Sequence, residues 1–266
     1  MTQVAIVTGA GRGIGAATVR ALASSGWAVL AVDICRDDPS LPYALATKDE
    51  LEHVVVEAGQ LAGDRDRVVS YVADVRDDEA IGAAVALAEQ RWGGLDAAIA
   101  AAGVIAGGVP LWEVPASQER AVLDIDLGGV FVLARAAIPA LLRRPKPRQG
   151  RFLAVASAAA TRGLPMLAAY CAAKAGVTGL VRALAVELRD SGVTANAVSP
   201  GSTDTLILAE SARLYGLSSG VDFSAQQPIG RLLDASEVAE VLVFLAGAKS
   251  SAMTGAVVAV DGGLAL

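Results

Sequence analysis

Three side chains in the second half of the chain have the types and spacing needed to move a proton at an alcohol oxygen. Ser157 follows an apolar run, and Tyr170 and Lys174 follow in the segment Tyr170-Cys-Ala-Ala-Lys174. Residues four apart share one helix face, so the Lys174 ammonium is expected beside the Tyr170 phenol. A nearby positive charge favours phenolate and lowers a pKa that is ordinarily near 10. The spacing alone also fits a packed tyrosine beside a surface lysine, but the strand-end serine and the turn described next favour chemistry.

A glycine-rich turn near the N-terminus predicts a dinucleotide site. The apolar run Val4–Val7 leads into Thr8-Gly-Ala-Gly-Arg-Gly-Ile-Gly15 and then into a segment of helical period. Glycines let the backbone approach a pyrophosphate, which the free N–H groups of the helix bind. Asp33 closes the second apolar run, where a carboxylate accepts hydrogen bonds from the adenosine ribose and repels a 2′-phosphate. NAD is therefore favoured over NADP, although Arg12 and Arg36 are cations that could offset this repulsion.

The composition of the 266-residue chain argues against several other classes of function. The chain is 54% hydrophobic with a net charge of −6, and its basic residues are scattered, unlike those of a nucleic-acid-binding protein. Cys35, Cys171 and the sole histidine, His53, provide neither a disulfide framework nor a set of metal ligands. The longest run without a charged residue, Ala97–Trp112, is shorter than a membrane span. With no signal-peptide pattern, a cytoplasmic protein with no metal, membrane or nucleic-acid partner is expected.

These residues must be positioned by short apolar strands that alternate with helices. The expected strands are Val4–Val7, Ala28–Val32, Val68–Val72, Ala97–Ala101, Arg151–Ala156, Thr194–Val198 and Val257–Val260, and the expected helices are 13–25, 48–62, 79–92, 117–142, 168–190 and 235–247. Continuous apolar strands separated by helices predict a parallel sheet covered on both faces. The fold class is thus α/β, a single Rossmann-like, doubly wound domain over residues 1–266 arranged as a three-layer sandwich. Its functional residues are expected at the C-terminal ends of the strands.

Together these motifs resemble the short-chain dehydrogenase/reductase family over nearly the whole chain. The resemblance extends to Asp74-Val75, Pro200-Gly201 and the terminal Thr254-Gly255 and Val260-Asp-Gly-Gly263. It implies that Asp74 and Val75 flank the adenine, that the segment 199–205 lines the nicotinamide side, and that Lys174 also binds the nicotinamide ribose. The cofactor-binding residues that follow from the turn and the resemblance are Gly9, Gly11, Arg12, Gly13, Ile14, Gly15, Asp33, Ile34, Asp74, Val75, Ala101, Ala102, Gly103, Tyr170, Lys174, Pro200, Gly201, Thr203 and Thr205.

Two positions depart from the family pattern. Ala100-Ala-Ala-Gly103 stands where the family often has Asn-Asn-Ala-Gly, so two asparagine side chains are missing. Asp126 falls where the resemblance implies a fourth catalytic residue, an asparagine. Asp126 can hold the same relay water, and its charge would keep Lys174 cationic. The expected catalytic set is Ser157, Tyr170, Lys174 and Asp126.

The segment 34–47 is longer than this family usually has after the ribose-binding acid. It resembles the insertion of a subfamily that is associated with the redox cofactor mycofactocin, includes carveol-dehydrogenase-like enzymes and holds NAD tightly. An ordinary surface loop is the alternative. Leu41, Tyr43 and Leu45 are expected to clasp the adenosine end of the cofactor.

A substrate lid is expected at about 204–227, and Trp112, Tyr215, Leu217 and Phe223 are placed either at the substrate mouth or in ordinary packing.

The predicted function is NAD-dependent hydride transfer between a secondary alcohol and a ketone on a small apolar substrate, with mycofactocin as a possible redox partner. The alternatives are an NADPH-dependent 3-oxoacyl reductase of the same fold and a catalytically silent dinucleotide-binding protein. The segment 117–142 and the helix of Tyr170 are apolar over more than one face. Such helices must be buried, and together with the resemblance they predict a homotetramer.

Overall fold

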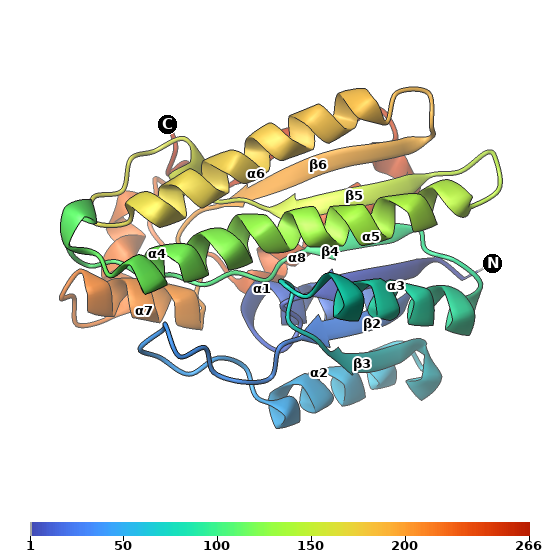
Figure 1. Ribbon diagram of the computed structural model, residues 1–266, viewed down its shortest axis with the longest axis horizontal. Helices are drawn as coiled ribbons and strands as arrows, with labels where there is room; N and C mark the ends of the chain where they lie inside the picture. Colours follow the sequence, from blue (N-terminus) through green and yellow to red (C-terminus); the bar gives the residue numbers. More distant parts are fainter. Residues whose placement is uncertain (1) are drawn as a thin grey trace.

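Seven parallel strands form one sheet in the order β3-β2-β1-β4-β5-β6-β7, as the computed structural model of the chain shows (Figure 1). The structure describes residues 2–266. The strands are β1 Val4–Thr8, β2 Ala28–Asp33, β3 Val68–Val72, β4 Ala97–Ala100, β5 Gly150–Val155, β6 Val193–Pro200 and β7 Val257–Val260. The order reverses between β1 and β4, which confirms the predicted doubly wound, Rossmann-like fold.

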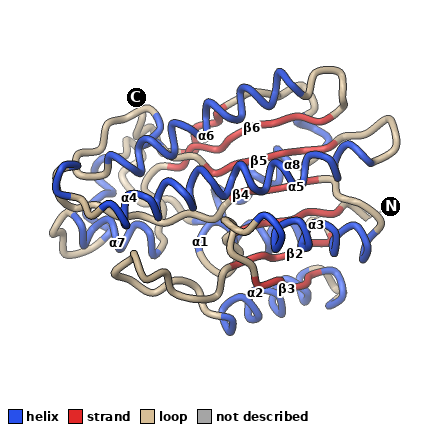
Figure 2. The backbone as a smooth tube through the Cα atoms, in the orientation of Figure 1, coloured by secondary structure: helices blue, strands red, loops and turns tan. Residues whose placement is uncertain are grey.

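Helices cover both faces of this sheet (Figure 2). One face carries α1 Gly13–Ser24, α2 Lys48–Leu61 and α8 Ala235–Ala246, and the other carries α3 Asp78–Trp92, α5 Gly129–Arg143 and α6 Ala168–Glu187. Two shorter helices, α4 Ala116–Leu123 and α7 Leu206–Leu214, lie at the end of the sheet where the strands finish. The molecule is therefore a three-layer sandwich.

The continuous apolar strands are explained by burial on both sides. Ile6 and Leu30 point into the core beneath α3, α5 and α6, whereas their neighbours Val7 and Val29 point into the core beneath α1 and α8. All residues of β1 and β2 are buried. A strand covered on both faces needs no polar alternation, and for this reason the strands could be predicted from short apolar runs.

The expected helix over 117–142 is interrupted by one turn of π-helix. Asp124–Gly128 adopts this wider turn between α4 and α5. The turn displaces one residue from the regular helical repeat, which the spacing of apolar residues does not reveal, and such turns are frequent at functional sites. Asp126 lies within it.

Two helical stretches are long and apolar enough to cross a membrane by length and composition, Ala116–Arg143 and Ala168–Glu187. A search for runs without charged residues does not find these helices, because each contains isolated charged residues. Both pack one side against the sheet, through residues such as Leu133 and Val177. Their apolar character is therefore consistent with core helices of a soluble α/β protein.

Candidate active site

A cavity of about 640 Å³ opens at the C-terminal ends of β1, β4, β5 and β6. It begins at the point where the strand order reverses, which is where open α/β sheets bind their ligands. Nearly all of the sequence-predicted site residues line it: Gly9, Arg12, Gly13, Ile14, Gly15, Asp33, Ile34, Asp74, Val75, Ala101, Ala102, Gly103, Ser157, Tyr170, Lys174, Pro200, Gly201, Thr203 and Thr205. Gly11 and Asp126, which were also predicted, lie behind the cavity wall.

The glycine turn has room for backbone only. A Cβ on Gly9 would lie 2.6 Å from the Ala102 backbone, and one on Gly15 would lie 2.0 Å from the Gly9 carbonyl oxygen. Gly9 and Gly13 also adopt positive φ angles of 68° and 53°. These glycines hold the start of α1 at the cavity, so its unpaired N–H groups are available for a phosphate.

Asp33 joins this turn to the end of β2. Its Oδ2 accepts a 2.8 Å hydrogen bond from the Gly11 N–H, and its Oδ1 accepts one from the Cys35 N–H. Burial raises the pKa of the Asp33 carboxyl, while these backbone donors and Arg12 act to lower it. Gly11 therefore serves the site by holding Asp33 and not by lining the cavity. A Cβ on Gly11 would lie 3.1 Å from the Asp33 Oδ2 and would crowd this hydrogen bond.

The two cations near Asp33 are both engaged by acids. Arg12 forms two hydrogen bonds with Glu50, Nε to Oε1 at 2.7 Å and Nη2 to Oε2 at 2.6 Å. These hydrogen bonds lower the pKa of Glu50 to about 2. The Arg36 side chain is 70% exposed and lies 3.5 Å from Asp74. Arg12 therefore acts on Asp33 only at a distance, as the smallest of the causes that lower its pKa, and no hydrogen bond joins either guanidinium to Asp33 among residues 2–266.

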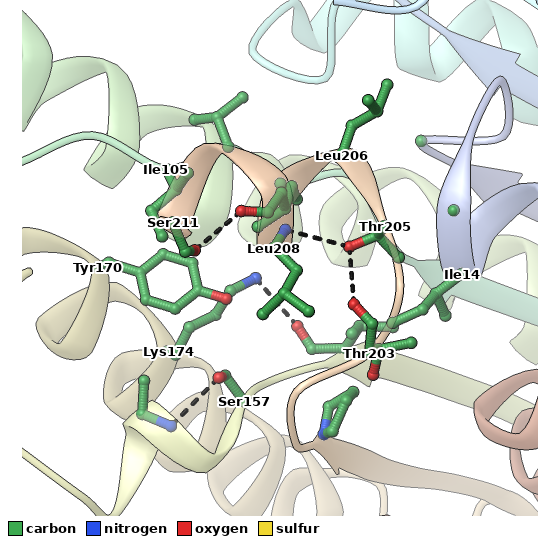
Figure 3. A pocket seen from close by; sticks show the side chains of 18 of the residues that line it. Ile14, Ile105, Ser157, Tyr170, Lys174, Thr203, Thr205, Leu206, Leu208 and Ser211 are labelled. Carbon is green, nitrogen blue, oxygen red and sulfur yellow. Dashed lines mark hydrogen bonds between the residues drawn. The ribbon is translucent and has the colours of Figure 1, made fainter. Parts of the chain in front are cut away.

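Ser157, Tyr170 and Lys174 converge on the same cavity from two elements (Figure 3). Ser157 follows β5, and its Oγ accepts a 3.1 Å hydrogen bond from the Ala159 N–H. Tyr170 and Lys174 come from α6, as the four-residue spacing predicted. Lys174 Nζ lies 5.6 Å from the centre of the Tyr170 ring and donates to the Val155 carbonyl oxygen at 3.2 Å.

Asp126 forms an ion pair with Lys174 from behind the cavity wall. Its Oδ2 lies 3.2 Å from Lys174 Nζ, and its Oδ1 accepts a 2.8 Å hydrogen bond from the Val104 N–H. The carboxylate is fully buried. Gly103 passes close by, and a Cβ there would lie 3.3 Å from both charged groups. Burial raises the pKa of the Asp126 carboxyl, whereas Lys174 and the Val104 N–H act to lower it. The π-helical turn thus brings a buried acid into direct contact with the lysine.

This ion pair determines the electrostatics of the site. Burial alone would lower the pKa of Lys174, but Asp126 and Tyr170 raise it above its usual value, so the lysine is an ammonium. Burial also raises the pKa of Tyr170. The Lys174 charge lowers that pKa, and the Asp126 charge raises it again. Burial outweighs the lysine, so the pKa of Tyr170 lies above its ordinary value, and not below it as the spacing of Tyr170 and Lys174 had predicted.

The remaining wall of the cavity is apolar and comes from α7 and nearby loops. It is formed by Val104, Ile105, Leu164, Leu167, Leu206, Ile207, Leu208, Tyr215, Leu217 and Phe223. Tyr215 packs edge-on against Phe223 with ring centres 6.0 Å apart and donates to the Pro165 carbonyl oxygen. Trp112 is 84% exposed and lies outside this wall.

Residues 34–47, hereafter the strap, form an ordered loop along the side of the cavity. Asp38 is buried, and its Oδ2 lies 2.8 Å from Arg76 Nη1. Tyr43 reaches the loop after β4, where its hydroxyl oxygen accepts a 2.9 Å hydrogen bond from the Ile105 N–H. Tyr43 therefore also contacts the substrate side of the cavity and not the adenosine end alone, where it was expected. An irregular loop carries no periodicity from which its path can be read.

Comparison with known proteins identifies relatives along the whole chain. A family model described as enoyl-(acyl carrier protein) reductase matches residues 9–265. Cis-4-hydroxycyclohexanecarboxylate dehydrogenase of Sinomonas cyclohexanicum is 36% identical over 263 residues, which are 98% of this chain and 96% of that protein. The crystal structure of carveol dehydrogenase from Mycobacterium avium in complex with NAD superimposes with a TM-score of 0.92 at 32% identity, covering 98% of this chain and 97% of that one. The crystal structure of a single-residue variant of actinorhodin polyketide ketoreductase with NADPH gives a TM-score of 0.87 at 32% identity, covering 99% and 97%.

Proposed function

Because the chain belongs to the short-chain dehydrogenase/reductase family, we propose that it is an NAD-dependent enzyme interconverting a secondary alcohol and a ketone, with Tyr170 as its proton-transfer group. The relatives show that it is an oxidoreductase of CH–OH groups, and the NAD or NADPH of the similar crystal structures supports a nicotinamide dinucleotide as its cofactor. The proposal rests above all on the convergence of Ser157, Tyr170 and Lys174 at one cavity.

The glycine turn fits a dinucleotide because its backbone approaches the cavity where any Cβ would collide. Gly9, Gly13 and Gly15 would hold the pyrophosphate, and Asp33 would accept hydrogen bonds from the adenosine ribose. When bound, the nicotinamide supplies or accepts the hydride.

The protein's own residues handle the proton. In alcohol oxidation, Tyr170 Oη takes the hydroxyl proton, and Ser157 Oγ holds the substrate oxygen in place. Lys174 stabilises the phenolate by its charge and would also bind the nicotinamide ribose. Asp126 and Tyr170 both favour the protonated form of Lys174, and Asp126 does so through a 3.2 Å contact. A positioned acid–base group of this kind commonly contributes about 10²- to 10⁴-fold in rate.

The preference for NAD rests on the charges around Asp33. A 2′-phosphate there would face a buried carboxylate, while Arg12 is already paired with Glu50 and Arg36 lies beside Asp74. This arrangement argues against the NADPH-dependent 3-oxoacyl reductase. The catalytically silent alternative is disfavoured because the serine, tyrosine and lysine all face the cavity.

The contacts of the strap are an argument for tight binding of the cofactor. We place the strap as an insertion in a single domain spanning residues 1–266, with residues 204–227 as the substrate lid. Tyr43 ties the strap to the Ile105 backbone, and Asp38 ties it to Arg76, which also pairs with Asp74. A cofactor beneath it would leave slowly, and reoxidation in place, for example by mycofactocin, would then sustain turnover. The proposed setting is the cytoplasm.

Two measurements test this function. The first denatures the purified protein and identifies any released nucleotide by mass, with NAD expected. The second compares turnover of cyclic secondary alcohols by the wild type, Tyr170→Phe and Tyr215→Phe. Tyr215→Phe is the matched control, because this tyrosine also lines the cavity but bonds Pro165. Tyr170→Phe should lose at least about 10²-fold with its cofactor retained, whereas near-normal turnover would refute the proton-transfer role.

A further inference from the structure

A second cavity, of about 470 Å³, lies at the opposite end of the sheet, where β5 and β6 begin. In Figure 1 these strand starts lie at the right, away from the helices α4 and α7 beside the active site. A strand rises about 3.3 Å per residue, so the length of β5 separates this cavity from Ser157 by roughly 20 Å. We call it the basic cavity, and its polar wall residues include Arg148, Arg151, Arg189, Asp190, Thr194, Ser251 and Thr254.

Arg151 is the most unusual residue of this wall. It is only 1% exposed, yet no carboxylate pairs with it among residues 2–266. Its Nε donates to the Gly247 carbonyl oxygen at 3.3 Å and its Nη1 to that of Gly150 at 3.0 Å, while its Nη2 is buried without a partner. Removing an ion from water costs several kcal/mol unless an opposite charge compensates. The fold thus buries a guanidinium that it does not neutralise.

Thr194 supplies a second unpartnered group at the same place. Its Oγ1 is buried without a hydrogen-bond partner. Arg151 and Thr194 are register partners in the parallel pair of β5 and β6, so their side chains leave the same face of the sheet. Across residues 2–266, one other buried side-chain polar atom lacks a hydrogen-bond partner, the Asp126 Oδ2 that faces Lys174. The other two such atoms, Arg151 Nη2 and Thr194 Oγ1, therefore belong to residues of the same cavity wall.

The charge of the wall is also unbalanced. Arg148 and Arg189 add two positive charges, and Asp190 is the single acid among the residues lining the cavity. The Arg148 guanidinium is held by backbone carbonyls, those of Arg144 at 2.9 Å and Ser191 at 3.3 Å. Three guanidinium groups against one carboxylate leave a net positive wall.

We propose that the basic cavity binds a phosphate group, either free or carried by a small metabolite. Arg151 and Thr194 point to this ligand because a guanidinium and a hydroxyl can both donate to an oxyanion, and guanidinium–phosphate hydrogen bonds are among the stronger ones in proteins. Nη2 and Oγ1 are themselves closed off from the cavity, so both side chains must turn toward the ligand when it binds. A water would leave the charge of Arg151 unbalanced. The basic cavity lies away from the active site, so the bound phosphate would affect the stability of the fold or the assembly of subunits.

The test measures the thermal unfolding midpoint in inorganic phosphate and in chloride at matched ionic strength. One set of samples also contains saturating NAD, because free phosphate could otherwise bind at the glycine turn and raise the midpoint from that site. A ligand of the native state raises the midpoint as its concentration increases. We expect this rise in wild type, with and without NAD, and its loss in Arg151→Met and Thr194→Val. Arg182→Met is the matched control, since Arg182 is an exposed arginine of α6 outside the cavity, and it should keep the rise.

Arg151→Met should also unfold no earlier than wild type in chloride, because it removes an unpaired buried charge. If that variant does not fold, Thr194→Val and Arg189→Met carry the comparison. Glycerol phosphate at the same concentration distinguishes a phosphorylated metabolite from inorganic phosphate. If the natural ligand is a phosphorylated metabolite, glycerol phosphate should raise the unfolding midpoint more than inorganic phosphate does. Equal midpoints in phosphate and chloride, or a rise that survives both Arg151→Met and Thr194→Val, would overturn the proposal and leave a cavity that holds water.

Discussion

Replacing Asp126 by asparagine should shift the pH dependence of alcohol oxidation to lower pH. Tyr170 must be deprotonated to accept the substrate proton, so activity rises with pH as the phenol ionises. The Asp126 carboxylate opposes that ionisation and raises the pKa of Tyr170, although burial is the larger cause. Asparagine keeps an oxygen for the Val104 N–H but carries no charge, so the anchoring hydrogen bond survives.

The size of the effect follows from the geometry. Asp126 Oδ2 lies 3.2 Å from Lys174 Nζ, and Nζ lies 5.6 Å from the centre of the Tyr170 ring. The carboxylate and the phenol are therefore separated by on the order of 9 Å. At an effective dielectric constant of about 20, two unit charges at this separation repel by about 2 kcal/mol. That corresponds to a factor of about 25 in the ionisation equilibrium of the phenol.

The assay records kcat/KM for alcohol oxidation from about pH 7 up to the highest pH at which the protein stays folded, because the pKa of Tyr170 lies above its ordinary value of about 10. It compares the wild type, Asp126→Asn and Asp124→Asn. Asp124 lies on the same π-helical turn but is exposed, so its substitution is the matched control for loss of one acid. Asp126→Asn should move the acid limb to lower pH, while Asp124→Asn leaves it in place. An acid limb that stays fixed, or moves to higher pH in Asp126→Asn, would refute the electrostatic role of this carboxylate.

Three further predictions concern the cofactor and the assembly. Asp33→Ala should weaken NAD binding and relieve the penalty against NADP, as titration calorimetry of cofactor-free protein would measure; tighter binding of NADP than NAD by the wild type would contradict this. Replacing the strap by a short Gly-Ser turn should speed release of bound NADH followed by fluorescence, because it removes the Tyr43 and Asp38 contacts; equally fast release from both proteins would make the strap an ordinary surface loop. Light scattering should show a tetramer that Phe131→Asp disrupts, since Phe131 is 46% exposed on the outward side of α5; a stable wild-type monomer at micromolar concentration would exclude it.

The sequence was most informative where one physical requirement dominates a segment. Runs such as Val4–Val7 are predictable because burial on both faces removes polar alternation. Tyr170 and Lys174 are predictable as neighbours because one helical spacing places them on the same face. The glycine turn is predictable because close approach of the backbone excludes side chains, as the short distances at Gly9 and Gly15 confirm.

Long-range contacts could not be predicted in this way. The family resemblance brought Asp126 near Lys174, but spacing alone could not, because their contact depends on a π-helical turn that leaves no signature in the apolar repeat. The reach of Tyr43 to Ile105 depends on the path of an irregular loop. The helix α7, with Thr205 as its N-cap, is short enough that its few apolar residues resemble those of a loop.

The ion pair between Arg12 and Glu50 has a consequence for redesign of this enzyme. A cation beside Asp33 already exists, but Glu50 holds it in two hydrogen bonds. Glu50 in turn belongs to the N-terminal cap of α2, where Thr47 shares it. Removing Asp33 alone would leave a 2′-phosphate without a counter-charge, whereas Glu50→Gln combined with Asp33→Ala would release Arg12 to meet it. Glutamine can keep the cap of α2, but Arg12 also donates to the Ala44 carbonyl oxygen of the strap. A change of coenzyme preference made in this way would therefore also alter a contact between the glycine turn and the strap.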